Sequence, residues 1–174
     1  APLLRDLNFS LDTGSFVCVL GKNGAGKSTL FQCILNLQKN YTGMISLDGQ
    51  NVKALKEKEL AKSIAYIPQL HKQSFPFSVF DTVLIGTAAS LSPFSTPKEA
   101  QKEAAMEALR LMGMEKYASR SFSHLSGGEQ QMVLIARALA QKAPILIMDE
   151  PCSNLDYGNQ IRLLKKLKQL SALG

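Results

Sequence analysis

Nine consecutive residues combine the groups that hold the phosphates of a nucleotide: Gly21, Lys22, Asn23, Gly24, Ala25, Gly26, Lys27, Ser28 and Thr29. The glycines permit backbone conformations in which successive N–H groups point inward around an anion. Lys27 adds a full positive charge for the β- and γ-phosphates, and Ser28 adds a hydroxyl for Mg²⁺. An apolar run at 16–20 precedes the stretch and a helical pattern follows it, which is the strand–turn–helix context of a phosphate loop. We therefore predict a nucleoside triphosphate site.

Two adjacent acids, Asp149 and Glu150, follow the apolar run at 145–148. A continuous apolar run that ends in acids is typical of a buried parallel strand that leads into a site. One carboxylate can support Mg²⁺, and the other can accept a proton from an attacking water or orient it. Gln69 follows another short apolar run, 64–67, but a glutamine in such a place indicates no chemistry by itself.

A second stretch that can receive an anion lies before a predicted helix and consists of Leu125, Ser126, Gly127, Gly128 and Glu129. Small residues at a helix start leave backbone N–H groups exposed to an anion. Ser126 and Glu129 also match the spacing of a capping box, and both interpretations can hold together. One nucleotide does not require two such helix starts, so a single chain leaves the second one unexplained.

The chemistry-bearing residues need strands and helices to position them. Apolar patterning predicts strands at 3–11, 16–20, 44–47, 64–67 and 145–148. Turns are predicted at 12–14 and 48–49, where Asp and Gly residues gather. Helical spacing predicts helices at 57–62, through 83–85, from Thr96 to Gly113, at 130–141 and in the basic segment near the end. Ser78 or Asp81 caps the second of these, and Thr96 with Glu99 forms a capping box that places Pro97 first in the third.

Composition limits the class of protein more than it defines the function. A chain of 174 residues with 45% hydrophobic residues suffices for one globular domain with a subdomain. Its net charge of +6 suits ATP, nucleic acid or an anionic membrane, but the Lys and Arg residues are spread along the chain. Three cysteines without a close pair, Cys18, Cys33 and Cys152, are interpreted as small buried hydrophobic residues.

Taken together and in this order, the motifs resemble the nucleotide-binding subunit of ABC transporters: the loop 21–28, Gln69, the signature 125–129, the acidic motif 145–150, and Ser153, Asn154, Leu155 and Asp156. The resemblance covers nearly the whole chain, and Leu-Ser-Gly-Gly is its most specific part. It implies an α/β fold with a P-loop NTPase (RecA-like) core, an N-terminal antiparallel β part and an inserted helical subdomain. The core would comprise 1–69 and 144–174, and the helical subdomain 70–143.

The resemblance also implies roles for the residues. Two copies would stack head to tail, with ATP and Mg²⁺ between the phosphate loop of one copy and the signature of the other. Lys27 would contact phosphate, Ser28 and Gln69 the Mg²⁺, and Asp149 would support the metal. Glu150 would be the catalytic base. The signature residues would act on the ATP of the partner copy, and 153–156 would lie at the dimer interface.

Some features of that family lie outside this chain. The chain opens without Met and stops after a helix with no following strand, so we expect a fragment of a longer polypeptide. The switch histidine would follow Gly174, and the aromatic residue that stacks on adenine would precede Ala1. Cys152-Ser153-Asn154 departs from the commoner Thr-Ser-Ala, but its small and polar character is kept.

The sequence around 77–83 resembles the ATPases of importers for iron–siderophores, haem, vitamin B12 and related metal chelates or oxyanions. We therefore expect an ATPase on the cytoplasmic side of a cell membrane, with a second copy of itself, permease subunits and a substrate-binding protein as partners, and no nucleic acid. The alternatives are the ATPase domain of an exporter, a soluble ABC ATPase that acts outside transport, and a binding module without hydrolysis. Lys27, Asp149 and Glu150 together disfavour the last.

Overall fold

The computed structural model describes residues 3–69, 77–91, 95–153 and 155–171. Its contacts divide the chain into two compact units. The first unit comprises Ala1–Lys56 and Tyr157–Gly174, and the second comprises Glu57–Asp156. The predicted boundaries of the core and the helical subdomain, at 69/70 and 143/144, fall inside the second unit and stay a prediction.

The first unit contains the phosphate-loop helix, a small hairpin and the last helix. Helix α1 spans Lys27–Ile34, and α6 spans Tyr157–Ser171. Strands β1 (Ser46–Leu47) and β2 (Gln50–Asn51) pair antiparallel, and the short helix η1 follows at Val52–Ala54. Asp48 and Gly49 both have positive φ, 49° and 78°, which is the geometry of a tight two-residue hairpin turn. The turn predicted at 48–49 is therefore confirmed, and the strand predicted at 44–47 forms only at Ser46–Leu47.

The strands predicted at 3–11 and 16–20 do not form. Both segments run without a strand partner, and their alternating apolar side chains stay exposed, for example Phe9 (59%) and Val17 (55%). Only the turn between them is as predicted, with Ser15 N–H donating to the Asp12 carbonyl at 3.0 Å and Gly14 at a φ of 79°. An extended segment counts as a strand only when a neighbour satisfies its backbone, and none of the described residues does so here. Cys18 is consequently exposed rather than buried.

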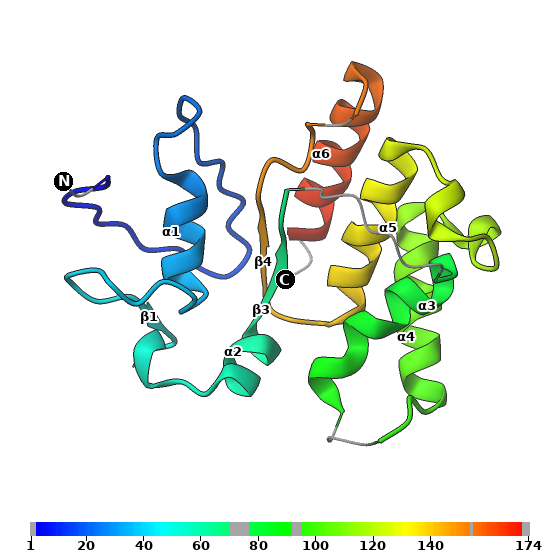
Figure 1. Ribbon diagram of the computed structural model, residues 1–174, viewed down its shortest axis with the longest axis horizontal. Helices are drawn as coiled ribbons and strands as arrows, with labels where there is room; N and C mark the ends of the chain where they lie inside the picture. Colours follow the sequence, from blue (N-terminus) through cyan, green and yellow to red (C-terminus); the bar gives the residue numbers. More distant parts are fainter. Residues whose placement is uncertain (1–2, 70–76, 92–94, 154, 172–174) are drawn as a thin grey trace. The chain divides into compact units, whose positions relative to one another are not determined.

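The second unit is built on a parallel pair of strands and on packed helices. Strands β3 (Ile64–Ile67) and β4 (Ile145–Met148) form at the two predicted apolar runs and pair parallel, but β4 is half-buried rather than buried. Helix α2 (Glu57–Ser63) leads into β3. Helices α3 (Val79–Leu84), α4 (Glu99–Met112) and α5 (Gly127–Ala140) pack against one another, with the short helix η2 at Ile85–Ser90 (Figure 1). Short helices η3 (Glu115–Tyr117) and η4 (Phe122–His124) connect α4 to α5.

Apolar side chains from α3, α4 and α5 form the core of the helical part. Val79, Val83, Leu109, Val133 and Ile135 have no exposed surface. The end of α5 is fastened to the strand pair through Gln141, whose Nε2 donates to the carbonyl oxygen of Ile64 at 3.0 Å and to that of Ala61. An amide group can donate twice, so one side chain holds the end of α2 and the start of β3 beside α5.

The helix caps agree with the sequence in all but one case. Ser78 caps α3 through its Oγ, which accepts from Asp81 N–H at 3.0 Å, and Gly113 ends α4 at a φ of 70°. The predicted start of α4 at Pro97 is wrong. The helix begins at Glu99 after Lys98, whose N–H donates to Gln101 Oε1 at 3.1 Å. Gln101 therefore satisfies the free backbone N–H of Lys98, so the N-cap lies two residues later than Thr96, where the sequence pattern had placed it.

Candidate functional site

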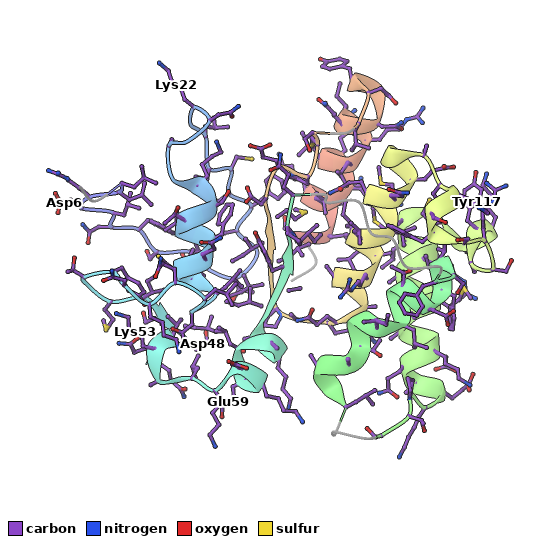
Figure 2. All side chains as sticks on the ribbon, in the orientation of Figure 1. Asp6, Lys22, Asp48, Lys53, Glu59 and Tyr117 are labelled. Carbon is purple, nitrogen blue, oxygen red and sulfur yellow. The ribbon has the colours of Figure 1, made fainter. Side chains whose placement is uncertain are left out.

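The phosphate loop wraps the start of α1 in the first unit. Lys27 turns back across the loop, and its Nζ donates to the carbonyl oxygens of Gly21 at 2.9 Å and Lys22 at 3.2 Å. Ala25 N–H donates to the Lys22 carbonyl at 3.1 Å and closes the turn. The Lys22 side chain, in contrast, extends away from the tip of the loop (Figure 2). The ammonium of Lys27 is thus held at the loop, where an anion would meet it.

Two of the loop glycines are required by backbone conformation, and the third lies in close contact with a neighbouring side chain. Gly24 and Gly26 have φ values of 80° and 97°, which disfavour any side chain. Gly21 has no such φ, but a Cβ there would lie 3.3 Å from Ala25 Cβ. Gly26 is also the N-cap of α1, so Lys27, Ser28 and Thr29 form its first turn, where free N–H groups and the positive dipole end favour an anion.

The register of the parallel strands brings Gln69 and Glu150 together in the second unit. Ile67 pairs with Met148, so Gln69 and Glu150 each lie two residues beyond the paired ends. Gln69 Nε2 donates to Glu150 Oε2 at 2.9 Å. The ladder continues between them, because Asp149 N–H donates to the Ile67 carbonyl at 2.9 Å. Both predicted site residues therefore stand at the carboxyl end of the strand pair, where sites of α/β folds form.

Glu150 holds an unusual backbone conformation. Its φ is 49°, in the left-handed region that a residue with a side chain adopts at a cost of about 1–3 kcal/mol. Its carbonyl accepts from Ser153 N–H at 3.1 Å, so a turn follows at once. This turn allows Glu150 to leave the alternation of the strand and to meet Gln69. The sequence carries no sign of this strain beyond the proline at 151.

Asp149 is a largely buried acid next to Glu150. The residue is 6% exposed, and no hydrogen bond or ion pair of its carboxylate is found among the described residues. Its oxygens are not among the buried unsatisfied atoms of the described residues, so water or a cation can reach them. Burial, and secondly the charge of Asp149, raise the pKa of the neighbouring Tyr66. Within the described residues no group of three or more His, Cys, Asp or Glu could hold a metal. A site with few carboxylates fits Mg²⁺, which uses one or two of them together with phosphate oxygens and water.

The signature forms the start of α5 as a complete capping box. Ser126 Oγ accepts from Glu129 N–H at 3.3 Å, and Glu129 Oε2 accepts from Ser126 N–H at 2.9 Å. Leu125 is buried, whereas Ser126 and Gly127 are exposed. The predicted helix therefore begins three residues earlier than expected, at Gly127. Glycine at this helix start leaves the N–H groups uncovered.

The signature and the 153–156 segment meet within the second unit. A Cβ on Gly128 would lie 3.1 Å from Leu155 Cδ2, and Leu155 is 7% exposed. Leu155 thus supports the signature from inside, while Ser153 and Asp156 are exposed and reachable for a partner. Asn154 lies outside the described residues. The proposed interface role of this segment stays a prediction.

The surroundings of Glu129 include residues that motif spacing did not find. Hydrogen bonds from the Ser126 backbone and side chain, then one from the Tyr117 side chain and the charge of Arg120, lower the pKa of Glu129. Tyr117 and Arg120 lie in the segment between α4 and α5, where Tyr117 is marked in Figure 2. Their distances along the chain from the signature match no helical or strand period, so only the folded chain brings them to it.

The predicted site residues are divided between the two units, each of which is described by itself. The phosphate loop, 21–29, belongs to the first unit. Gln69, Asp149, Glu150 and the signature all belong to the second. No helix of the described residues is long and apolar enough to cross a membrane. The chain has a phosphate loop that leads into α1, and it has acids that follow a parallel strand. These two features define a nucleoside-triphosphate-binding protein of the P-loop class.

Comparison with known proteins gives the family. The sequence model of the ABC transporter family matches residues 4–153. An uncharacterized ABC transporter ATP-binding protein of Haemophilus influenzae is 47% identical over 97% of this chain and 64% of its own length. The molybdate import ATP-binding protein MolC of the same species is 37% identical over 97% of the chain and 62% of its own length. The chain belongs to the ABC transporter family, and it spans less than two thirds of the length of these relatives.

Solved structures agree with this assignment. An inward-facing transporter described as of the metal-chelate ABC type superposes with a TM-score of 0.83 at 37% identity, over 95% of this chain and 61% of that one. The ATP-binding cassette MJ0796, a dimer bound to ADP and Pi in a post-hydrolysis state, superposes with a TM-score of 0.81 at 29% identity. The superposition covers 97% of this chain and 75% of that one. The predicted α/β P-loop NTPase fold is thereby confirmed.

Proposed function

We propose that this chain binds ATP and hydrolyses it as the energising part of a membrane importer. The observation that carries the proposal is the hydrogen-bonded pair of Gln69 and Glu150, next to the largely buried residue Asp149. The chain belongs to the ABC transporter family and has an intact phosphate loop. Together with that loop, these three polar side chains are the groups that the transfer of a phosphoryl group to water requires. A module that only bound nucleotide would have no need of the strained Glu150.

Each residue of the loop has a task in that reaction. The amides of Gly24 and Gly26 and the first turn of α1 cradle phosphate oxygens, and the Lys27 ammonium exchanges its two carbonyl partners for β- and γ-oxygens. Ser28, Gln69 and Asp149 would hold Mg²⁺, directly or through water. That ion neutralises charge on the β- and γ-phosphates when it is bound.

Glu150 orients the attacking water and takes up its proton. Its carboxylate now accepts a hydrogen bond from Gln69 at one oxygen, Oε2. That bond fixes the direction of the carboxylate and leaves the other oxygen for a water molecule. The Gln69 amide can in turn present its own oxygen to the metal, so one side chain connects the metal and the base.

A second copy of the chain completes the site. Ser126 and Gly127 are exposed at the start of α5, and the N–H groups of this helix start suit the γ-phosphate held by the partner copy. This explains why one chain has two helix starts that can receive phosphate. The dimeric state of the relative bound to ADP and Pi supports the same arrangement.

The names of the relatives support a proposal for the transport partner and the cargo. A molybdate importer and a metal-chelate type transporter are among the similar proteins, and we propose import of a metal compound such as an iron chelate, haem or cobalamin. Phe77, 46% exposed just before α3, offers apolar surface to a permease subunit. The chain would act on the cytoplasmic side of the membrane, with a substrate-binding protein delivering the cargo.

The test is Glu150→Gln in the full-length protein. The amide removes the base but keeps the shape, so ATP turnover should fall by at least about 100-fold while ATP stays bound and holds two copies together. Turnover is measured by phosphate release, and the dimer by size-exclusion chromatography with ATP. Glu107→Gln, at an exposed residue on α4 whose carboxylate lies 3.9 Å from Lys142, is the matched control. Undiminished turnover in Glu150→Gln would refute the assignment of the base.

A further inference from the structure

The side chain of Gln141 bridges two parts of the chain that lie far apart in the sequence. Gln141 is the C-cap of α5, and its Nε2 donates to the carbonyl oxygen of Ile64 at 3.0 Å and to that of Ala61. Both hydrogen bonds are partly buried. The Ala61 carbonyl belongs to the last turn of α2, where carbonyl groups have no partner within the helix. The bridge therefore satisfies a backbone group that α2 itself leaves open.

This bridge acts at the amino end of the parallel strand pair. Helix α2 ends at Ser63 and β3 starts at the next residue, Ile64, so the anchored helix leads directly into the strand. Ile64 pairs with Ile145, the first residue of β4, and Gln141 lies four residues before Ile145. The side chain thus joins the segment that enters β4 to the segment that enters β3. It is placed where the register of the two strands begins.

The backbone around Gln141 gives its side chain a fixed base. Gln141 N–H donates to the Ala138 carbonyl at 3.2 Å, and Lys142 N–H donates to the Leu139 carbonyl at 3.0 Å. Lys142 has a φ of 56°, so the chain leaves the helix in a sharp turn directly after the cap. Helix α5 itself packs against α3 and α4. A bridge from this support resists sliding of β3 along β4.

A second side-chain bridge closes the carboxyl end of the same strands. Gln69 lies five residues beyond Ile64, and Glu150 lies five residues beyond the partner of Ile64 in β4. Gln69 Nε2 donates to Glu150 Oε2 at 2.9 Å, so the two side chains meet only in the observed register. Four paired residues hold that register weakly, because parallel pairing is slightly less stable per residue than antiparallel pairing. The pair of Gln69 and Glu150 therefore depends on what holds the start of β3.

We propose, on the basis of the proposed function, that Gln141 is a positioning residue for ATP hydrolysis. It holds the start of β3, and it thereby keeps Gln69 where its amide directs the Glu150 carboxylate toward the attacking water. Gln141 has no contact with nucleotide in this role, and its effect passes through the pair of Gln69 and Glu150. The direction of the base matters to the chemical step and not to nucleotide binding. Loss of Gln141 therefore lowers kcat and leaves the KM for ATP nearly unchanged.

The experiment compares two substitutions of Gln141 in full-length protein, with ATP turnover followed by phosphate release. Gln141→Met keeps the length of the side chain and removes the donor. Its kcat should fall at least about tenfold, while the KM for ATP changes less than about twofold. Gln141→Lys offers donors to both carbonyl groups again and should restore most of the activity. If Gln141→Lys is as slow as Gln141→Met, donation to these carbonyls is not the cause and the inference is wrong.

Gly86→Ala is the matched control for a general loss of stability. It crowds η2 against the Arg137 carbonyl of α5 and leaves the Gln141 bridge in place. At a temperature well below the unfolding transitions of all variants, its kcat should stay within about twofold of the parent. A kcat for Gly86→Ala as low as that of Gln141→Met would show that lost stability alone slows turnover, and it would overturn the inference.

The decisive comparison adds Gln69→Ala. Without the Gln69 amide there is no bond to Glu150 for Gln141 to preserve, so Gln141→Met in that background should change kcat less than about twofold. Its Tm should still fall as far as it does with Gln69 in place, which separates the kinetic role from the structural one. If Gln141→Met slows turnover equally with and without Gln69, or raises KM instead of lowering kcat, the inference is wrong. If the unmodified full-length protein hydrolyses no ATP, the proposed function itself fails. A parent that hydrolyses ATP while Gln141→Met equals it refutes this inference alone.

Discussion

Two glycine-to-alanine changes should separate packing from function. Gly86 lies in η2 against α5, where an added Cβ would stand 2.1 Å from the carbonyl oxygen of Arg137. Backbone atoms cannot rotate away, so η2 and α5 must move apart by roughly 1 Å in a close-packed interior. Overpacking of this kind costs about 1–3 kcal/mol, and the better helix propensity of alanine returns up to about 1 kcal/mol. A net loss of about 2 kcal/mol lowers Tm by roughly 4–8 °C in a chain of this size.

Gly128→Ala should behave in the opposite way. The nearest atom to its added Cβ is Leu155 Cδ2 at 3.1 Å, the end of a flexible side chain that can shift by a few tenths of an ångström. The gain in helix propensity offsets that shift, so Tm should stay within about 2 °C of the parent. The new methyl group nevertheless covers part of the helix start that we propose receives the partner's γ-phosphate. ATP-dependent dimerisation should therefore fall by at least about tenfold.

Differential scanning calorimetry and ATP titration of dimer formation measure the two effects side by side in full-length protein. Gly86→Ala should lose stability and, well below its transition, dimerise with ATP like the parent. A Tm within about 1 °C of the parent for Gly86→Ala would refute the close approach of η2 and α5. A drop of several degrees for Gly128→Ala would show that Leu155 cannot yield, and its dimer defect would then say nothing of phosphate binding.

Two further predictions follow from single side chains. Because the folded-state pKa of Glu129 lies below the ordinary 4.5, its stabilising contribution is present above that pH and is lost as the pH falls through the folded value. The difference in unfolding free energy between the parent and Glu129→Gln, from urea titrations, should therefore shrink below about pH 4.5, and a constant difference would contradict the cause. Cys18 is exposed and Cys33 is 8% exposed, so a thiol reagent should label Cys18 at least about tenfold faster. Equal rates would mean that the 16–20 segment is covered after all.

Local sequence signals predicted the elements whose geometry is set nearby. The turn at Asp48–Gly49, the cap at Ser78 and the end of α4 at Gly113 each depend on a residue that prefers one conformation. The strand predictions for 3–11 and 16–20 were wrong because a strand is not set by its local sequence alone. Their alternation shows that one face would be apolar, but a strand also needs a neighbour, and sequence periodicity does not say whether one is present.

The site was predictable as far as its residues share a contiguous motif. The loop at 21–29 and the capping box of Ser126 and Glu129 follow from spacing, because both depend on the local backbone of one helix start. Tyr117 and Arg120, which contribute to the lowered pKa of Glu129, lie in the connection between α4 and α5, and no spacing rule covers such residues. The positive φ of Glu150 was equally hidden, since it results from a turn that starts before the strand alternation is complete.

The meeting of Gln69 and Glu150 depends on the register of a pair of strands only four residues long. A slip by one residue would displace one of them by about 3.3 Å and turn its side chain to the opposite face. In so short a pair the backbone hydrogen bonds alone define the register weakly. Gln141 adds to it, because its side chain holds the carbonyl groups of Ile64 and Ala61. Gln141 ends the same helix that begins with the signature, about 21 Å away along α5. One helix therefore holds, at its two ends, the serine that we propose faces a partner's phosphate and the strand that carries Gln69 to Glu150.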